Sequence, residues 1–184
     1  MTYEMDICGL KMNLPICKVT DDLYIGAFVM FGDVELTVHC AAELLKKAPE
    51  YDYLLAPEAK SIPLLYEMAR QSGAEKYFVA RKGAKASMTD VFEVSVRSIT
   101  TMHVQKLVLD KADADMIKGK RILILDDVIS TGESLRATEE LVNQAGGIIA
   151  GQMAVLAEGA AYDRDDIIVL GKLPLFNADG TVKD

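Results

Sequence analysis

Hydrophobic residues in the middle of the chain follow two patterns that alternate along the sequence. In one, apolar residues recur at the 3.6-residue spacing of a helix; in the other, they form the short continuous runs typical of buried strands. The helical pattern covers residues 36–47, 63–73 and 135–145. The strand pattern covers residues 53–56, 77–80, 121–125 and 148–156. Strands that alternate with helices predict an α/β fold, with a central, mainly parallel sheet flanked by helices.

Three other segments depart from this alternation. Residues 91–97 and 102–109 alternate apolar and polar positions, which predicts a hairpin or a long excursion with strand-like arms. Residues 1–35 and 159–184 continue neither pattern, and we expect them to form a small hood over the ligand crevice. The sequence thus predicts one domain of 184 residues, with a core at about 36–158.

Charge and composition exclude some classes of protein. The formal net charge is −8, from 20 basic and 28 acidic side chains, which argues against a general nucleic-acid binder. No apolar run approaches the ~20 residues of a membrane span, and residues 1–6 lack the basic region and apolar stretch of a signal peptide. The three cysteines are odd in number and have no metal-ligand spacing. We therefore expect a cytoplasmic protein that binds neither membrane nor nucleic acid.

The strongest chemical signal is the segment Ile122–Ser134. A buried strand leads into two adjacent carboxylates, and a turn of small and hydroxyl-bearing residues then enters a helix. Backbone N–H groups and hydroxyls at a helix N-terminus suit a phosphate monoester, while carboxylates can accept hydrogen bonds from sugar hydroxyls or organise Mg²⁺ through water. The pattern indicates a site for a phosphorylated sugar, and its candidate residues are Asp126, Asp127, Val128, Ile129, Ser130, Thr131, Gly132, Glu133 and Ser134.

This segment resembles the thirteen-residue motif with which type I phosphoribosyltransferases bind 5-phosphoribosyl-1-pyrophosphate (PRPP). Two other segments resemble the pyrophosphate-binding parts of the same family, and the resemblance covers roughly Leu36 to Glu158. One is the loop Glu58-Ala59-Lys60-Ser61, in which the family often has a cis peptide; Ala59-Lys60 is our candidate for that bond. The other is the basic group Arg81, Lys82 and Lys85.

The resemblance implies a transferase that uses PRPP, a nitrogenous base and Mg²⁺, and that forms a homodimer. Asp126 and Asp127 would hold the ribose hydroxyls and, largely through PRPP and water, the metal. Lys60 and Arg81 would stabilise the departing pyrophosphate, so these four residues are the candidate catalytic groups. A PRPP-sensing regulatory protein of the same fold is the alternative, and the intact Lys60 and Arg81-Lys82 favour catalysis.

The identity of the base is less constrained by the sequence. A purine is favoured, with adenine slightly ahead of xanthine and orotate as a further alternative, because the Glu58-Ala59-Lys60 loop resembles the adenine branch. The stretch Ser98–Thr101 and the segment Leu173–Phe176 look as much like the xanthine branch. Candidate base-binding residues are Ile16, Phe28, Glu158 and Phe176.

Overall fold

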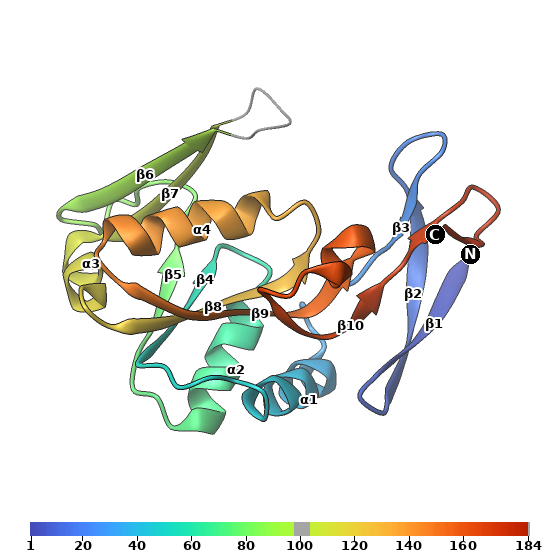
Figure 1. Cartoon of the computed structure of the whole chain (residues 1–184), viewed down its shortest axis with the longest axis horizontal. Helices are drawn as coiled ribbons and strands as arrows, with labels where there is room; N and C mark the ends of the chain where they lie inside the picture. Colours follow the sequence, from blue (N-terminus) through green and yellow to red (C-terminus); the bar gives the residue numbers. More distant parts are fainter. Residues whose placement is uncertain (98–103, 184) are drawn as a thin grey trace.

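The computed structural model describes residues 1–97 and 104–183, and its centre is a parallel sheet (Figure 1). The strands lie in the order β10-β9-β8-β4-β5, and each pairs in parallel with its neighbour. Their bounds are β4 Tyr53–Pro57, β5 Tyr77–Ala80, β8 Arg121–Ile129, β9 Ile148–Glu158 and β10 Ile168–Leu173. The predicted α/β class is confirmed.

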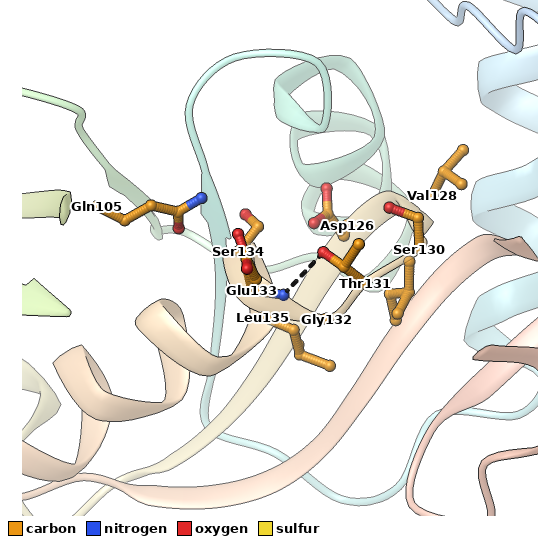
Figure 2. A pocket seen from close by; sticks show the side chains of 10 residues that line it. Gln105, Asp126, Val128, Ser130, Thr131, Gly132, Glu133, Ser134 and Leu135 are labelled. Carbon is orange, nitrogen blue, oxygen red and sulfur yellow. Dashed lines mark hydrogen bonds between the residues drawn. The ribbon is translucent and has the colours of Figure 1, made fainter. Parts of the chain in front are cut away.

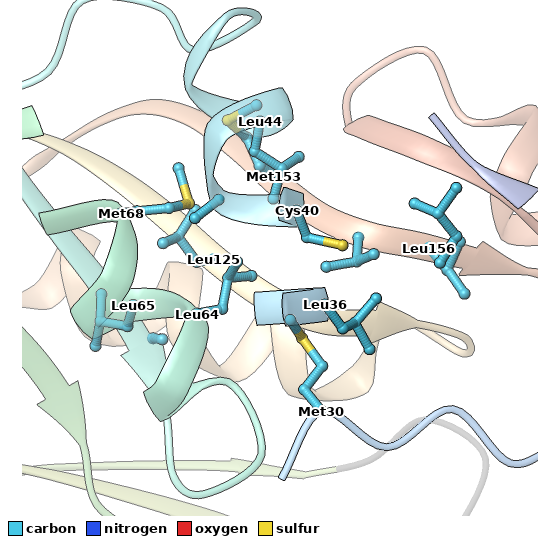
Figure 3. Close-up of a cluster of buried hydrophobic side chains, with 14 of the residues drawn as sticks. Met30, Leu36, Cys40, Leu44, Leu64, Leu65, Met68, Leu125, Met153 and Leu156 are labelled. Carbon is cyan, nitrogen blue, oxygen red and sulfur yellow. The ribbon is translucent and has the colours of Figure 1, made fainter. Parts of the chain in front are cut away.

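Helices cover both faces of this sheet, which explains why its strands are apolar throughout. Neighbouring residues of β8 point in opposite directions: Leu123 belongs to the core beneath α1 (Val34–Leu45) and α2 (Ile62–Ser72), whereas Ile124 belongs to the core beneath α4 (Glu133–Gln144). Figure 3 shows the first of these cores. A strand buried on both faces needs a continuous apolar run, as the sequence has here.

The helix ends follow capping chemistry. The Asp33 side chain caps α1 by accepting a hydrogen bond from the Leu36 N–H at 3.0 Å. Gly73 ends α2 in the left-handed conformation, as its sequence position predicts. No helix within the described residues is long and apolar enough to span a membrane.

The chain ends form a separate antiparallel sheet, which confirms the predicted hood. Its strand order is β1-β2-β3-β11-β12, and the two termini lie close together in it (Figure 1). The strands are β1 Thr2–Ile7, β2 Leu10–Lys18, β3 Tyr24–Gly26, β11 Leu175–Phe176 and β12 Val182–Lys183. Residues 27–33 connect β3 to α1 and so join the hood to the core.

The two alternating segments form the predicted hairpin, β6 (Val91–Arg97) and β7 (Val104–Asp110). It packs over α4 and is joined to the sheet region by backbone hydrogen bonds between Arg81 and Val108, at 2.9 and 2.8 Å. This bridge places the hairpin beside the loop that follows β5. Ser98–Thr101 lie outside the described residues.

The structure corrects three details of the sequence interpretation. Strand β10 adds a fifth strand to the parallel sheet, so part of 159–184 belongs to the core rather than to the hood. Strand β8 continues to Ile129 because pairing with β9 extends that far. Helix α3 (Lys111–Ile117) was not expected; its seven residues are too few for a clear period, and the Asp110 side chain caps it.

Candidate active site

Two carboxylates lie near the carboxyl end of β8 and are almost completely buried. Asp126 is 8% exposed and Asp127 is 5% exposed. Asp126 Oδ1 accepts hydrogen bonds from Ser61 Oγ at 2.7 Å and from the Asp127 N–H at 2.9 Å. Burial holds the pKa of Asp126 well above its usual range, although the Ser61 hydrogen bond opposes this. Asp127 Oδ2 is buried without a hydrogen-bond partner, so it is available to a ligand.

The segment after these carboxylates forms a cavity of about 220 Å³ at the start of α4 (Figure 2). Gly132 has φ +78°, the left-handed conformation that lets the chain turn sharply into the helix. Ser130, Thr131 and Ser134 contribute hydroxyl-bearing side chains to its lining, and the Glu133 N–H donates to the Thr131 hydroxyl at 3.5 Å. The lining residues are Gln105, Asp126, Val128, Ile129, Ser130, Thr131, Gly132, Glu133, Ser134 and Leu135, and we call this space the phosphate cavity.

A second cavity of about 290 Å³ lies between the hood and the parallel sheet. It shares Val128 and Ser130 with the phosphate cavity, so the two adjoin at the end of β8. Asp126 lines the phosphate cavity, whereas Asp127 lines this second one. The lining residues are Ile25, Gly26, Ala27, Phe28, Val29, Lys60, Asp127, Val128, Ser130, Glu158 and Leu173, and we call this space the hood cavity.

The hood cavity is lined by the partly buried carboxyl group of Glu158 and the exposed ammonium group of Lys60. Burial raises the pKa of Glu158, while the nearby positive charge of Lys60 lowers it. Phe28 contributes an aromatic wall from the hood side. A carboxylate, an ammonium group and an aromatic ring around one small space suit a flat, polar heterocycle.

The loop after β4 contains the predicted pyrophosphate residues, and the structure assigns them different environments. The cis peptide joins Glu58 to Ala59, so our expectation of Ala59-Lys60 was wrong by one residue. Lys60 points to the hood cavity, and Ala59 is exposed. Ser61 is 1% exposed and binds Asp126, which ties this loop to the end of β8.

Glu58 is linked to the basic loop that follows β5. Its Oε2 accepts a hydrogen bond from the Lys82 N–H at 3.0 Å, and its Oε1 lies 3.3 Å from Arg81 Nε. The hydrogen bond from the Lys82 N–H and the proximity of Arg81 lower the pKa of Glu58, despite partial desolvation. Lys82 also lines a third cavity of about 370 Å³, together with Pro57, Val104, Gln105, Lys106, Leu107 and Ser134. Lys85 is exposed on the same loop.

Two of the four base candidates line the hood cavity, and two do not. Phe28 and Glu158 are among its lining residues. Phe176 is fully buried inside the hood, where its ring packs edge-on against Tyr3 with centroids 5.1 Å apart. Ile16, on β2, pairs with Gly26 through the backbone and is not among the described lining residues.

The sequence interpretation missed the part of the hood cavity that comes from β3 and the residues after it. Ile25, Gly26, Ala27 and Val29 were not singled out. Residues 1–35 showed no clear strand pattern, so the close approach that Gly26 permits within β3 could not be recognised from the sequence. A Cβ on Gly26 would lie only 3.2 Å from Leu173 Cδ1 and 3.3 Å from Leu14 Cδ1.

The buried carboxylates Asp126 and Asp127 do not form a closed metal site with other side chains of the described residues. No cluster of three or more His, Cys, Asp or Glu side chains that could hold a metal ion occurs among the described residues. The unpartnered, buried Oδ2 of Asp127 nevertheless suits a metal held mainly by ligand oxygens and water. The residues therefore fit an indirect Mg²⁺ site and do not form a closed protein cage.

Fold and site together define an α/β protein with two adjoining cavities at the carboxyl end of β8, one at the start of α4 and one beneath the hood. Comparison with known proteins identifies the class further. The chain belongs to the phosphoribosyl transferase family, whose domain model matches residues 35–177.

Relatives in this family include enzymes for different bases. The chain is 31% identical over 128 residues to adenine phosphoribosyltransferase from Rhodococcus jostii, covering 70% of this chain and 68% of that protein. It is 28% identical over 147 residues to orotate phosphoribosyltransferase from Caldanaerobacter subterraneus, covering 79% of this chain. That match spans only 63% of the length of the orotate enzyme.

Solved structures show the same fold. Adenine phosphoribosyltransferase from Thermoanaerobacter pseudethanolicus superposes with a TM-score of 0.63 at 23% identity, covering 77% of this chain and 83% of that one. The enzyme from Saccharomyces cerevisiae, solved with an imino-altritol bisphosphate and adenine, has a TM-score of 0.63 at 17% identity and covers 92% and 93%. At these identities the likeness concerns the fold.

Proposed function

We propose that this protein transfers the 5-phosphoribosyl group from PRPP to a purine base, giving a nucleoside monophosphate and pyrophosphate. The observation that carries the proposal is the junction of the phosphate and hood cavities at Val128 and Ser130. One buried carboxylate lines each side of that junction. A sugar phosphate lying across it would have its phosphate in one cavity and its anomeric carbon towards the other.

Each part of the donor has a matching group. The turn Ser130–Ser134 would bind the 5-phosphate through N–H groups and hydroxyls at the start of α4. Asp126 and Asp127 would accept hydrogen bonds from the ribose hydroxyls. Lys60, Arg81, Lys82 and Lys85 would supply positive charge to the pyrophosphate. Mg²⁺, bound with the diphosphate and reached by the two aspartates through water, would offset more of its negative charge.

The reaction is a displacement at the anomeric carbon. The bond from this carbon to the pyrophosphate oxygen breaks, and a new bond forms to a ring nitrogen of the base. Positive charge develops on the ribose ring in between, as in glycoside chemistry. Asp126 and Asp127 are almost completely buried, so an ionised carboxylate at this place would stabilise such a transition state strongly.

The hood cavity supports a base that carries an amino group. Glu158 can accept a hydrogen bond from an exocyclic amine such as that of adenine, whereas a carboxylate beside a ring carbonyl would be repelled. This favours adenine over xanthine. The similarity to the adenine enzyme from Rhodococcus jostii is consistent with that preference. Because the chain is also similar to an orotate enzyme, the assay below includes pyrimidines.

Homodimer formation and a cytoplasmic location belong to the same proposal. The exposed apolar side chains of Phe31, Val34 and Tyr66 would lose contact with water in such a dimer. The three cysteines are free thiols, in keeping with a reducing compartment. Light scattering of the purified protein tests the oligomeric state.

A product assay tests the function directly. Purified protein, Mg²⁺ and PRPP are incubated with adenine, xanthine, guanine, hypoxanthine, orotate and uracil in separate reactions, and nucleotides are separated by chromatography. We expect adenosine monophosphate to form fastest. PRPP binding by calorimetry without nucleotide from any base would favour a sensor in place of an enzyme.

A further inference from the structure

Arg164 is held in a defined position just after β9. It follows the 3₁₀ helix Gly159–Asp163, and its N–H donates to the Ala161 carbonyl at 3.3 Å. Ala161 is buried in the core beneath α4, which anchors this short helix. The Arg164 backbone is therefore fixed relative to the parallel sheet and is not part of a freely moving tail.

The guanidinium group of Arg164 is also fixed. Its Nε donates to Asp166 Oδ1 at 2.8 Å, and its Nη2 donates to Asp166 Oδ2 at 2.6 Å. Two parallel hydrogen bonds hold a planar guanidinium in one orientation. This pairing raises the pKa of Arg164 further, so the side chain stays positively charged. The third nitrogen, Nη1, is thereby aimed in one direction.

Nη1 is aimed at the turn that lines the phosphate cavity. An ideal Cβ built on Gly132 would lie 2.7 Å from Arg164 Nη1, closer than real side chains allow. Gly132 therefore has two reasons to be glycine: its φ of +78° and the approach of this guanidinium. Arg164 itself is not among the residues that line the phosphate cavity, so it contacts the turn from outside.

The described residues that line the phosphate cavity carry negative charge only, so a positive group close to the cavity would help to bind a phosphate. Among the described residues that line it are two carboxylates, Asp126 and Glu133, and no lysine or arginine. The chain as a whole carries a net charge of −8. A phosphate dianion entering this cavity meets unfavourable charge unless a cation lies close by. The Arg164 guanidinium lies against the turn at Gly132, with its charge partly offset by the Asp166 carboxylate.

We propose that Arg164 is a positioning residue for the phosphate-binding turn: its guanidinium, oriented by Asp166, supports the backbone at Gly132 and supplies positive charge to a pentose 5-phosphate bound there. The inference rests on the proposed function only for the class of ligand. It adds a residue far along the chain from Ile122–Ser134 to the phosphate site.

The test compares two arginines with the same local chemistry. Arg70 donates from Nε and Nη2 to both carboxylate oxygens of Glu67, at 2.9 and 2.7 Å, so its pairing matches that of Arg164 with Asp166. Glu67 lies on α2, outside both cavities. Arg164→Ala, Arg164→Lys, Asp166→Asn and the control Arg70→Ala are made in the full chain.

Ribose 5-phosphate binding is measured by calorimetry at low and high salt, with thermal unfolding as a second readout. We expect Arg164→Ala to weaken binding about tenfold at low salt and less at high salt. Arg164→Lys should regain part of the affinity because it keeps the charge. Asp166→Asn should have an intermediate effect, since it loosens the orientation of the guanidinium, and Arg70→Ala should bind like the wild type.

Several results would overturn the proposal. These are wild-type affinity in Arg164→Ala, an equal loss in Arg70→Ala, or no ribose 5-phosphate binding by the wild-type protein. A lower melting temperature in Arg164→Ala with unchanged affinity would show a purely structural role and would also overturn it. Nucleotide formation from PRPP and a base is measured in a separate assay of the same proteins. Arg164-dependent binding without nucleotide formation would retain this inference and remove the proposed transfer.

Discussion

The phosphate cavity and the hood cavity adjoin, yet they are built in different ways. Ten consecutive positions, 126–135, supply nine of the ten residues that line the phosphate cavity, and Gln105 supplies the tenth. The hood cavity draws on five separate segments, from Ile25 to Leu173. A site formed by one strand, one turn and one helix start depends mainly on local backbone geometry. A site assembled from distant segments depends on how the hood docks on the sheet.

The difference has a chemical consequence. Backbone N–H groups at the start of α4 can bind a phosphate whatever the base, so the phosphate cavity suits a constant part of the substrate. Side chains such as those of Phe28 and Glu158 line the hood cavity. Their shape and charge can favour one base over another. We expect substitutions in the two cavities to separate donor binding from base preference.

The largest expected effect is that of Asp127→Asn, at the junction of the two cavities. Replacing the buried carboxylate by a neutral amide removes negative charge next to the developing positive charge of the ribose ring. We expect kcat to fall about 100-fold, measured as the rate of nucleotide formation. Asp115→Asn, in the exposed pair with Lys111 on α3, is the control and should leave the rate unchanged. Equal rates in Asp127→Asn and the wild type would exclude Asp127 from the reaction.

Phe176→Ala tests whether the hood cavity depends on the packing behind it. Removing this fully buried ring should lower the free energy of unfolding by about 3 kcal/mol, measured by chemical denaturation. It should also raise the KM for the base while ribose 5-phosphate affinity stays unchanged. Val19→Ala, in the same hood, is the control, because Val19 is 53% exposed and its loss should change stability by less than about 0.5 kcal/mol.

Lys60→Ala should affect the donor although Lys60 lines the hood cavity. Loss of an ammonium group near the departing pyrophosphate should lower kcat/KM for PRPP about 30-fold, measured by initial rates at saturating base. Lys120→Ala, an exposed lysine before β8, serves as the control. A change in the KM for the base alone would move Lys60 from the pyrophosphate site to the base site.

Glu158→Gln should alter the choice of base without altering donor binding. An uncharged amide accepts a weaker hydrogen bond from an amino group and can donate to a carbonyl. We expect the ratio of kcat/KM for adenine to that for xanthine to fall about fivefold. Ribose 5-phosphate binding, followed by calorimetry, should be unchanged. An unaltered ratio would mean that the base does not contact Glu158.

The smallest effect is expected outside both cavities, at Glu67. Arg70 and Gln71 lower the pKa of Glu67 to about 2, so the folded state favours its carboxylate. This stabilisation is present above the unfolded pKa of about 4.5 and is lost as pH falls towards 2. Because Arg70 is largely exposed, we expect Glu67→Gln to cost only about 1 kcal/mol at pH 7, and almost nothing at pH 2. Activity should be unchanged; a loss of turnover would tie the α2 face to the site.

Much of the fold was predictable because its causes are local. A strand buried on both faces must be apolar throughout, as at Ile122–Leu125, and Gly73 ends α2 where a left-handed residue is needed. The carboxylates and the Ser130–Ser134 turn were predicted as a phosphorylated-sugar site for the same reason. Strand, turn and helix start follow one another in the chain, so the sequence by itself determined their relative positions.

Only the tertiary structure decided the contacts between distant segments. The residues around Phe176 and Ile16 in the chain do not show that both side chains lie outside the hood cavity. The sequence likewise does not show that Ile25–Val29 line it. Likewise, Ser61 meets Asp126 across 65 positions, and Arg164 reaches Gly132 only after β9 has crossed the sheet. Such contacts depend on sheet order, strand length and hood docking, which are set by the packing of the whole core and have no signal in any single segment.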